Sequence, residues 1–460
     1  MVALMWFRRD LRLRDNPALA AATAGDGDVA PVFVLDPALL SPSGGPRLAV
    51  LFRTLRALDS QLGGTLILRH GKPETVLPQL CAEVGAGSVH CAADFGPYGS
   101  ARDDRVAAAL AVPLVRTGSS YAVPPGRITN GSGTNYQVYS GFYRAWLARG
   151  WPQPATSVRP RWVSAPSDGV PPDPALSSGV QSGTDSAPSS GPVLPDVGEA
   201  AARTAWRAFL DGSLNRYADE RNRPDLDSTS RMSVHLKWGT VHPRTLLADL
   251  GAGHEVFRKE LAWREFYADV LHHNPRSARD YYRPQLKALR YADSADSAAG
   301  SERMRAWEAG RTGYPIVDAG MRQLLAEGWM HNRVRMIVAS FLVKDLHVEW
   351  TAGARHFMAH LVDADLASNS HGWQWVAGTG TDPAPYYRIF NPTLQGRKFD
   401  PDGTYVRRHV PELAHLSVKH IHEPWGDPNG APAGYPAPIV DHSAERNASL
   451  ADYNALRNRG

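Results

Sequence analysis

Cysteine is almost absent from this chain of 460 residues, which contains only Cys81 and Cys91. Two thiols cannot supply a disulfide framework, a four-cysteine zinc site or an iron–sulfur cluster, and we expect both to be reduced and partly buried. No apolar run approaches the ~20 residues that cross a bilayer, which excludes an integral membrane protein. The N-terminus lacks the signal-peptide order of charge, apolar stretch and cleavage site, so we expect a cytoplasmic protein.

Charge of one sign is also scarce, because 50 Lys and Arg stand against 46 Asp and Glu. The formal net charge of +4 is compatible with a nucleic-acid partner but does not require one. Aromatic residues are more informative: the chain has 13 Trp and 16 Tyr, many of them beside Arg and Asn in its second half. Such side chains either form core or stack on a planar ligand or a base, and composition leaves both open.

The first third of the chain alternates short apolar runs with amphipathic stretches. This alternation predicts βαβ units and a Rossmann-like parallel sheet over residues 1–130. No GxGxxG motif follows the first strand, although ligands of such sheets usually bind at the carboxyl ends of strands. The expected strands are Val2–Trp6, Val29–Asp36, Thr65–Arg69, Ser88–Ala92 and Pro113–Arg116, and the expected helices are Arg47–Leu62, Pro73–Glu83 and Ala101–Leu110.

The rest of the chain changes character twice. Pro, Ser and Gly dominate from Trp151 to Val197, which predicts an extended inter-domain linker over residues 131–198. From residue 199 to residue 460 the pattern is helical almost throughout, and it predicts an all-α domain large enough to enclose a cofactor. The clearest helical stretches are Glu199–Leu210, Glu255–Leu271, Tyr314–Glu327 and Asn332–Lys344.

Two of these helices concentrate polar and aromatic side chains. Glu260, Trp263 and Arg264 share one face, since they lie at positions i, i+3 and i+4. This stripe suits either a surface salt-bridge cluster or a pocket that hydrogen-bonds and stacks on a heteroaromatic ring. On the second helix, Asn332 and Met336 lie one turn apart beside Arg335 and present an amide, a soft apolar group and a cation.

Carboxylates and hydroxyls form two further candidate groups. Asp363 and Asp365 have the spacing of metal ligands, but His371 has no second His at ligand spacing, so we expect no metal. We expect a buried ion pair with Arg335 instead. The hydroxyls of Thr229 to Ser233, with Tyr217, either cap a helix or hold phosphates.

Long motifs over nearly the whole chain together resemble the photolyase/cryptochrome family. The start MWFRRDLRLRDNPAL resembles the opening of its antenna domain. The segments KELAWREFY, RTGYPIVDAGMRQLLAEGWMHNRVRM, DADLASNSHGWQW and TGTDPAPYYRIFNP resemble its flavin-domain motifs and follow the same order. The resemblance implies an α/β antenna domain at 1–130 and a helical FAD-binding catalytic domain at 199–460.

The resemblance implies non-covalently bound FAD. Arg335 with Asp363 would form an ion pair beside the flavin ring, Asn369 would face a ring nitrogen, and Phe257 stands where relatives usually have Trp. The FAD-binding residues implied in this way are Tyr217, Thr229, Ser230, Arg231, Met232, Ser233, Phe257, Arg264, Arg335, Asp363, Asp365 and Asn369.

The implied function is light-driven repair of cyclobutane pyrimidine dimers in DNA, by electron transfer from excited reduced FAD to the flipped-out dimer. Asn332 and Met336 match the class I branch that repairs these dimers, whereas the (6-4) branch tends to have His at the Asn332 position. The alternative is a cryptochrome-like blue-light photoreceptor that binds FAD without repair. The implied catalytic residues are Glu260, Asn332, Met336 and Asn369, and the implied DNA contacts are Arg221, Glu260, Trp263, Asn332, Arg333, Met336, Trp375 and Arg388. Further basic candidates are Arg397, Lys398 and Arg407, and we expect a monomer.

The resemblance also implies an electron-transfer chain and an antenna. Trp373 and Trp350 match the inner two members of a tryptophan chain, but the outer Trp is missing, and Tyr291 is the candidate in its place. The segment from Gly96 to Asp103 resembles deazaflavin-type photolyases and lacks the Glu that folate-type antennas offer. We therefore expect 8-hydroxy-5-deazaflavin, with methenyltetrahydrofolate, FMN or no antenna as alternatives.

Overall fold

A computed structural model describes residues 1–25, 27–174, 192–289, 298–382, 387–430 and 432–457. The chain divides into two compact units. Unit 1 comprises Met1–Pro174, Pro195–Asn215 and Ser230–Pro275, and unit 2 comprises Ala175–Leu194, Arg216–Thr229 and Arg276–Gly460. The boundaries of these two compact units differ from the predicted domain boundaries, which stay a prediction.

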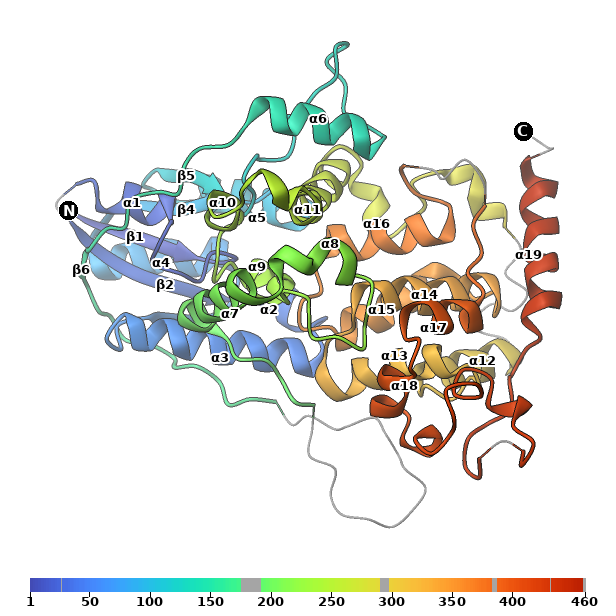
Figure 1. Cartoon of the computed structure of the whole chain (residues 1–460). Helices are drawn as coiled ribbons and strands as arrows, with labels where there is room; N and C mark the ends of the chain where they lie inside the picture. The colour runs from blue at the N-terminus through green and yellow to red at the C-terminus, as the bar shows by residue number, and fades with distance from the viewer. Residues whose placement is uncertain (26, 175–191, 290–297, 383–386, 431, 458–460) are drawn as a thin grey trace. The chain divides into compact units, whose positions relative to one another are not determined.

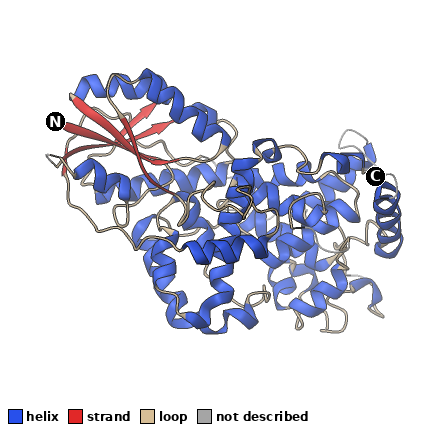
Figure 2. Cartoon of the chain, turned by 90° about the horizontal axis from the view of Figure 1, so that it is seen from above, coloured by secondary structure: helices blue, strands red, loops and turns tan. Residues whose placement is uncertain are grey.

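Unit 1 is built on a parallel sheet, as the sequence predicts. The strand order is β3-β2-β1-β4-β5, and a short sixth strand pairs with β2. Helices lie on both faces of the sheet (Figure 2). The strands are β1 (Val2–Phe7), β2 (Asp28–Leu35), β3 (Ile67–His70), β4 (Ala86–Ala93), β5 (Leu114–Ser119) and β6 (Arg161–Trp162).

The sheet has two apolar cores because alternate side chains of a strand point to opposite faces. Met5 and Phe7 of β1 belong to one buried cluster, and Leu4 and Trp6 belong to the other. Both faces are therefore covered, which explains the nearly continuous apolar runs in the sequence. The sequence analysis did not predict helix α1. The helices that cover the sheet include α1 (Pro17–Thr23), α2 (Pro37–Leu40), α3 (Gly45–Gln61), α4 (Pro73–Val84) and α5 (Pro97–Ala109).

The described part of residues 131–198 contains helix α6 (Tyr139–Arg149) and strand β6, so it is not extended throughout, and the inter-domain linker stays a prediction. The segment is also fastened to the sheet domain by side chains. Asp173 accepts hydrogen bonds from Arg53 and Arg56, each at 2.7 Å, and the Oγ of Ser167 accepts one from the Leu68 amide at 2.9 Å. Composition alone missed these contacts because their partners lie about 100 positions away.

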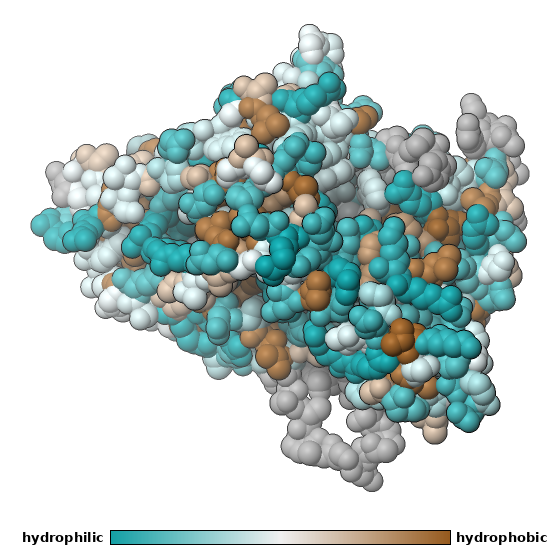
Figure 3. Space-filling model, in the orientation of Figure 1, coloured by the Kyte–Doolittle hydropathy of each residue, from teal (hydrophilic) through white to brown (hydrophobic). Residues whose placement is uncertain are grey.

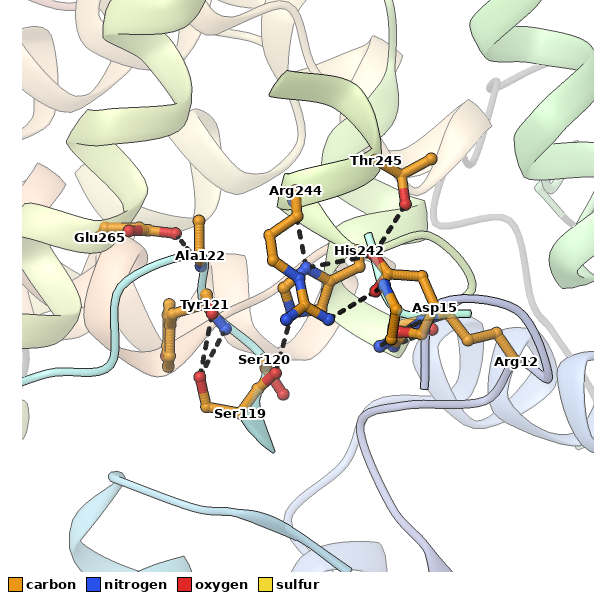
Figure 4. A network of polar contacts seen from close by, with 12 residues as sticks. Arg12, Asp15, Ser119, Ser120, Tyr121, Ala122, His242, Arg244, Thr245 and Glu265 are labelled. Carbon is orange, nitrogen blue, oxygen red and sulfur yellow. Dashed lines mark hydrogen bonds and ion pairs between the residues drawn. The ribbon is translucent and has the colours of Figure 1, made fainter. Parts of the chain in front are cut away.

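The later helices of unit 1 are joined to the sheet by a buried polar network (Figure 4). Asp15 accepts hydrogen bonds from Arg244 at 2.5 Å and from Thr245 at 2.9 Å. The Nε2 of His242 lies 3.0 Å from the Ser119 carbonyl, and its Nδ1 accepts from the Arg244 amide. Burial holds the pKa of His242 well below 6.5, so the ring is neutral. These helices are α7 (Gly198–Gly212), α9 (Met232–Trp238), α10 (Pro243–Ala248) and α11 (Glu255–His273).

Unit 2 is helical, and none of its described residues lies in a strand. Its core lies among the helices from α13 to α16. The prediction of an all-α region after residue 199 is confirmed for the described residues (Figure 1). The helices are α8 (Tyr217–Glu220), α12 (Ala298–Glu308), α13 (Pro315–Glu327), α14 (Asn332–Lys344), α15 (Trp350–His360), α16 (Leu366–Ala377), α17 (Pro392–Phe399), α18 (Thr404–His409) and α19 (His442–Arg457).

The surface drawn in Figure 3 is mostly hydrophilic, with hydrophobic residues scattered over it. Large apolar side chains that are exposed include Leu394 and Trp425. These two side chains line one pocket of unit 2, together with Tyr314 and Val440. No helix in the described part of the chain combines the length and the apolar character that a bilayer-spanning helix needs.

Candidate functional site

The predicted ion pair of unit 2 is present. Arg335 on α14 donates to both carboxylate oxygens of Asp363, from Nη1 to Oδ1 at 3.2 Å and from Nη2 to Oδ2 at 2.9 Å. The Asp363 side chain is 1% exposed and that of Arg335 is 24% exposed. A third bond, from Nε to the Met330 carbonyl at 2.8 Å, fixes the guanidinium plane. The Arg335 guanidinium is therefore a positively charged group that is fixed in orientation and partly accessible to solvent.

Asp365 and Asn369, which follow Asp363 in the sequence, are fixed by hydrogen bonds to α16 and α15. Asp365 caps α16, since its side chain accepts from the Ser368 amide at 3.1 Å. Asn369 donates from Nδ2 to the Ala354 carbonyl at 3.0 Å. Asp363 and Asp365 thus have separate roles, and no three His, Cys, Asp or Glu side chains in the described ranges cluster as metal ligands.

The predicted lesion contacts of unit 2 lie on two helices. Asn332 is exposed at the first position of α14, and Met336 follows one turn later. Met336 and Trp375 are partly buried and pack against the core of the unit. Both therefore keep some apolar surface outside the core.

The predicted phosphate contacts differ in their surroundings. Arg333 donates to Asn222 Oδ1 from Nε and Nη2, at 3.0 and 2.8 Å, and lies over the Phe399 ring. The guanidinium of Arg221 lies 5.7 Å from the ring centroid of Tyr217, and Arg388 is exposed.

Of the further basic candidates, Arg397 pairs with Glu423. Arg407 donates to the carbonyls of Ala414, at 3.2 Å, and Leu416, at 2.7 Å. Lys398 lies 5.3 Å from the centroid of the neighbouring Phe399 ring. Arg407 therefore holds its own surroundings together, which makes it the weakest of the three as a DNA contact.

The two predicted electron-transfer tryptophans are buried in unit 2. Trp350 is 1% exposed and Trp373 is 3% exposed. Both rings belong to the apolar core of unit 2, and neither indole N–H has a hydrogen-bond partner among the described residues. The Trp373 ring contacts Trp307 at 6.1 Å between centroids, and the Trp350 ring contacts Tyr281 at 5.9 Å. Tyr291, the predicted outer member, lies outside the described residues.

Of the predicted hydroxyl-rich residues, Ser230 to Ser233 lie in unit 1 at the start of α9, whereas Tyr217 and Thr229 belong to unit 2. The Ser230 Oγ accepts from the Met232 amide at 3.3 Å, and Arg231 adopts a positive φ of 49° immediately before the helix. Met232 is buried, whereas Ser233 is exposed. Arg231 is the N-cap of α9 and makes no side-chain capping bond, so Ser230 only closes the turn before the helix, and the exposed Ser233 leaves a hydroxyl for a ligand.

Helix α11 carries the predicted residues Phe257, Trp263 and Arg264, and each already contacts protein. Trp263 stacks on Tyr139 with ring centroids 3.7 Å apart. Phe257 is 4% exposed and packs in an aromatic cluster of unit 1. Arg264 donates to the Ser120 carbonyl at 2.9 Å and to the Leu236 carbonyl at 3.3 Å.

Two buried residues near these sites were not identified from the sequence. Glu265 of α11 accepts from the Ala122 amide at 2.5 Å, the Val123 amide at 3.1 Å and the Trp146 indole at 2.6 Å. Lys344 of α14 donates to a backbone carbonyl. Glu265 lies within the motif KELAWREFY and Lys344 lies outside the quoted motifs, but in both cases the sequence does not mark the partners, which are mostly backbone groups distant in sequence.

A charged cluster lies at the carboxyl ends of β1 and β4. Arg8 pairs with Asp103, and Arg102 lies 2.8 Å from Asp103 and 3.3 Å from Asp94. Burial alone would raise the pKa of Asp94, but the neighbouring arginines lower it overall. A Cβ on Gly99 would lie 2.1 Å from the Asp94 carboxylate, so any other residue there would displace that carboxylate.

Comparisons with known proteins agree with the resemblance. Residues 3–160 match the family model described as DNA photolyase, and residues 257–455 match the one described as FAD binding domain of DNA photolyase. The chain is 40% identical to a deoxyribodipyrimidine photo-lyase of Halobacterium salinarum, over 99% of each chain, and 42% identical to one of Streptomyces griseus, over 97% of each. It is also similar to the crystal structure of a bacterial class III photolyase from Agrobacterium tumefaciens, with a TM-score of 0.85, 37% identity and coverage of 99% of this chain and 98% of that one.

Proposed function

The chain belongs to the DNA photolyase family, and on that premise we propose that it repairs cyclobutane pyrimidine dimers in DNA under light, with FAD as its cofactor. The observation that carries the proposal is the bidentate pair between Arg335, on the helix that also bears Asn332 and Met336, and Asp363, which lies just before the helix that bears Trp375. It combines a fixed cation with an amide and apolar surface, as a heteroaromatic cofactor and a flipped-out pyrimidine dimer require.

The residues of each unit fit the chemistry of FAD. On unit 2, Asp363 holds Arg335 in one orientation, and the Ala354 carbonyl holds the amide of Asn369. Such donors suit the carbonyls and nitrogens of a flavin ring. On unit 1, the exposed hydroxyl of Ser233 at the start of α9 suits a phosphate. When bound and reduced, FAD supplies the electron that light transfers to the dimer.

The protein's part in the reaction is to bind and orient the substrate. Trp263 and Trp375 would stack on the dimer, and Met336 would add an apolar contact. Glu260 would hydrogen-bond the dimer where negative charge develops on it. Arg388 would bind a phosphate. The dimer must first leave the duplex, and its weakened stacking lowers that cost.

The class I assignment and the deazaflavin antenna are the finer parts of the proposal. The class rests on Asn332 and Met336, so Asn332→His should abolish dimer binding. The antenna rests on Gly96–Asp103 and on the charged side chains at the carboxyl ends of the strands, where ligands of parallel sheets bind. Chromophore extracted from protein made in a host that synthesises deazaflavin should show 8-hydroxy-5-deazaflavin rather than a folate or FMN.

The direct test is repair of an oligonucleotide with one cyclobutane thymine dimer by FAD-loaded, reduced protein. The matched reactions are a dark control and an oligonucleotide with a (6-4) lesion. Repair of the dimer alone, and only in light, is the expected result. An absence of repair by protein that holds reduced FAD and absorbs light would favour the photoreceptor alternative and overturn the proposal.

A further inference from the structure

One ridge of α14 carries residues with two kinds of environment. Asn332, Met336, Ser340 and Lys344 follow one another at intervals of four residues, so they are successive neighbours on the helix surface. The first two are the proposed lesion contacts. Ser340 is 1% exposed and Lys344 is 2% exposed, although both side chains are polar.

Both buried residues contact the segment that carries Arg388. The Nζ of Lys344 donates to the Arg388 carbonyl at 2.5 Å and lies 4.2 Å from the ring centroid of Tyr387. The Oγ of Ser340 accepts from the Phe390 amide at 3.3 Å. Arg388 itself is exposed. The backbone at Arg388 and two residues after it is thus fixed by two side chains of one helix.

The ring of Tyr387 has little freedom to move. It stacks on Tyr453 of α19 with centroids 4.3 Å apart and an interplanar angle of 11°. On its other edge lies Gly378, where a Cβ would be 3.1 Å from the ring. The ammonium of Lys344 therefore meets a ring that is already in place, which suits a cation–π contact.

We propose that Lys344, assisted by Ser340, is a positioning residue for DNA binding: it fixes the backbone of Arg388 so that the exposed guanidinium is preorganised for a phosphate. Fixing a binding group before association reduces the entropy lost when it binds. A buried ammonium is costly to desolvate, and burial lowers the pKa of Lys344 to about 7. An apolar residue would fill the same space at lower cost but would leave the Arg388 carbonyl without this donor.

The inference rests on the proposed function, so its test measures binding separately from repair. FAD-loaded protein would be titrated in the dark into a fluorescent oligonucleotide with one cyclobutane dimer, and the dissociation constant measured by anisotropy at several salt concentrations. The variants are Lys344→Met, Arg388→Gln and the double variant. Lys419→Met, which removes an exposed lysine of the same unit, is the matched control.

Lys344→Met is expected to weaken binding about five- to tenfold. Arg388→Gln loses one phosphate contact, so the slope of its log Kd against log salt should be smaller than that of the wild type by ~0.9. Lys344→Met should reduce this slope toward the value for Arg388→Gln. The double variant should bind no more weakly than Arg388→Gln alone, because Lys344 acts through Arg388. Lys344→Arg keeps a donor and should restore part of the affinity, and Lys419→Met should bind like the wild type.

Additive losses in the double variant, or an unchanged salt slope in Lys344→Met, would show that Lys344 only stabilises the fold and would overturn the inference. If Lys344→Met does not fold, Ser340→Ala in the same cycle with Arg388→Gln decides the question by the same criteria. If the wild type repairs dimers but the variants give these negative results, this inference alone is overturned. A wild type that binds dimer DNA no better than undamaged DNA would overturn the proposed function with it.

Discussion

Helices α11 and α14, one in each unit, place a buried ionisable side chain near proposed lesion contacts, and they do so in opposite ways. On α11 the buried group is Glu265, which accepts from the amides of Ala122 and Val123 and from the indole of Trp146. Burial raises its pKa, and these three donors oppose that rise. The buried carboxyl group thus accepts three hydrogen bonds. Figure 4 shows Glu265 beside Ala122.

On α14 the buried group is Lys344, which has one carbonyl and one aromatic ring as its partners. Burial lowers its pKa to about 7, so about half of the side chains carry a proton near neutral pH. The comparison separates two uses of buried charge: Glu265 secures the interior of unit 1, whereas Lys344 holds an exposed binding group in place at a cost to stability.

The largest expected effect is that of Glu265→Ala. This change leaves two backbone amides and an indole N–H of unit 1 without their acceptor, and buried unsatisfied donors cost about 1–3 kcal/mol each. We expect a loss of about 3 kcal/mol or more in unfolding free energy, measured by urea denaturation. Glu255→Ala is the control on the same helix, since its exposed pair with Lys259 should contribute less than about 1 kcal/mol. Equal losses in the two variants would contradict the role of Glu265.

The pH dependence of Lys344 should come next in size. Between its folded pKa of about 7 and its ordinary 10.5, the unfolded chain binds more protons at this residue, so wild-type stability should rise with pH. The nearby Asp345 opposes the shift and Arg388 adds to it. The unfolding free energy of the wild type minus that of Lys344→Met should therefore rise by about 2 kcal/mol from pH 7 to pH 9. A difference that stays constant over this range would mean that Lys344 keeps an ordinary pKa.

Glu260→Ala should distinguish chemistry from positioning. Glu260 is proposed to stabilise charge on the dimer, so its loss should lower the repair quantum yield several-fold even with DNA at saturation. Lys344→Met should show the reverse, with weaker binding and an unchanged yield once the complex is formed. Steady-state repair under controlled light, at saturating DNA, measures both. An unchanged yield in Glu260→Ala would remove that residue from the chemistry.

Sequence reasoning identified the sheet and the later helices because alternation and helical spacing are local properties. All five predicted strands are present, and the predicted Asn332–Lys344 helix has the same bounds in the structure. The Arg335–Asp363 pair was also accessible, since both side chains belong to recognisable motifs.

The contacts of Glu265 and Lys344 were not accessible in the same way. Glu265 bonds to backbone amides 142 and 143 residues away, and Lys344 to a carbonyl 44 residues away. Backbone groups are common to nearly all residues, so no residue type at the partner position marks such a bond. Strand β6 was missed for a related reason: two paired residues leave no periodicity in a segment rich in Pro, Ser and Gly.

The smallest expected effect is that of Ser340→Ala, compared with Ser119→Ala in unit 1. Both are buried hydroxyls that accept a backbone amide, from Phe390 at 3.3 Å and from Tyr121 at 3.2 Å. Ser340→Ala should lose about 1 kcal/mol of unfolding free energy, because one amide loses its partner, and Ser119→Ala should lose at least as much, because Ser119 also donates to the Tyr121 carbonyl at 3.0 Å. Only Ser340→Ala should also weaken dimer binding, by two- to threefold, since only Ser340 holds the segment of Arg388. Equal weakening by both variants would show that lost stability, rather than the position of Arg388, sets the affinity.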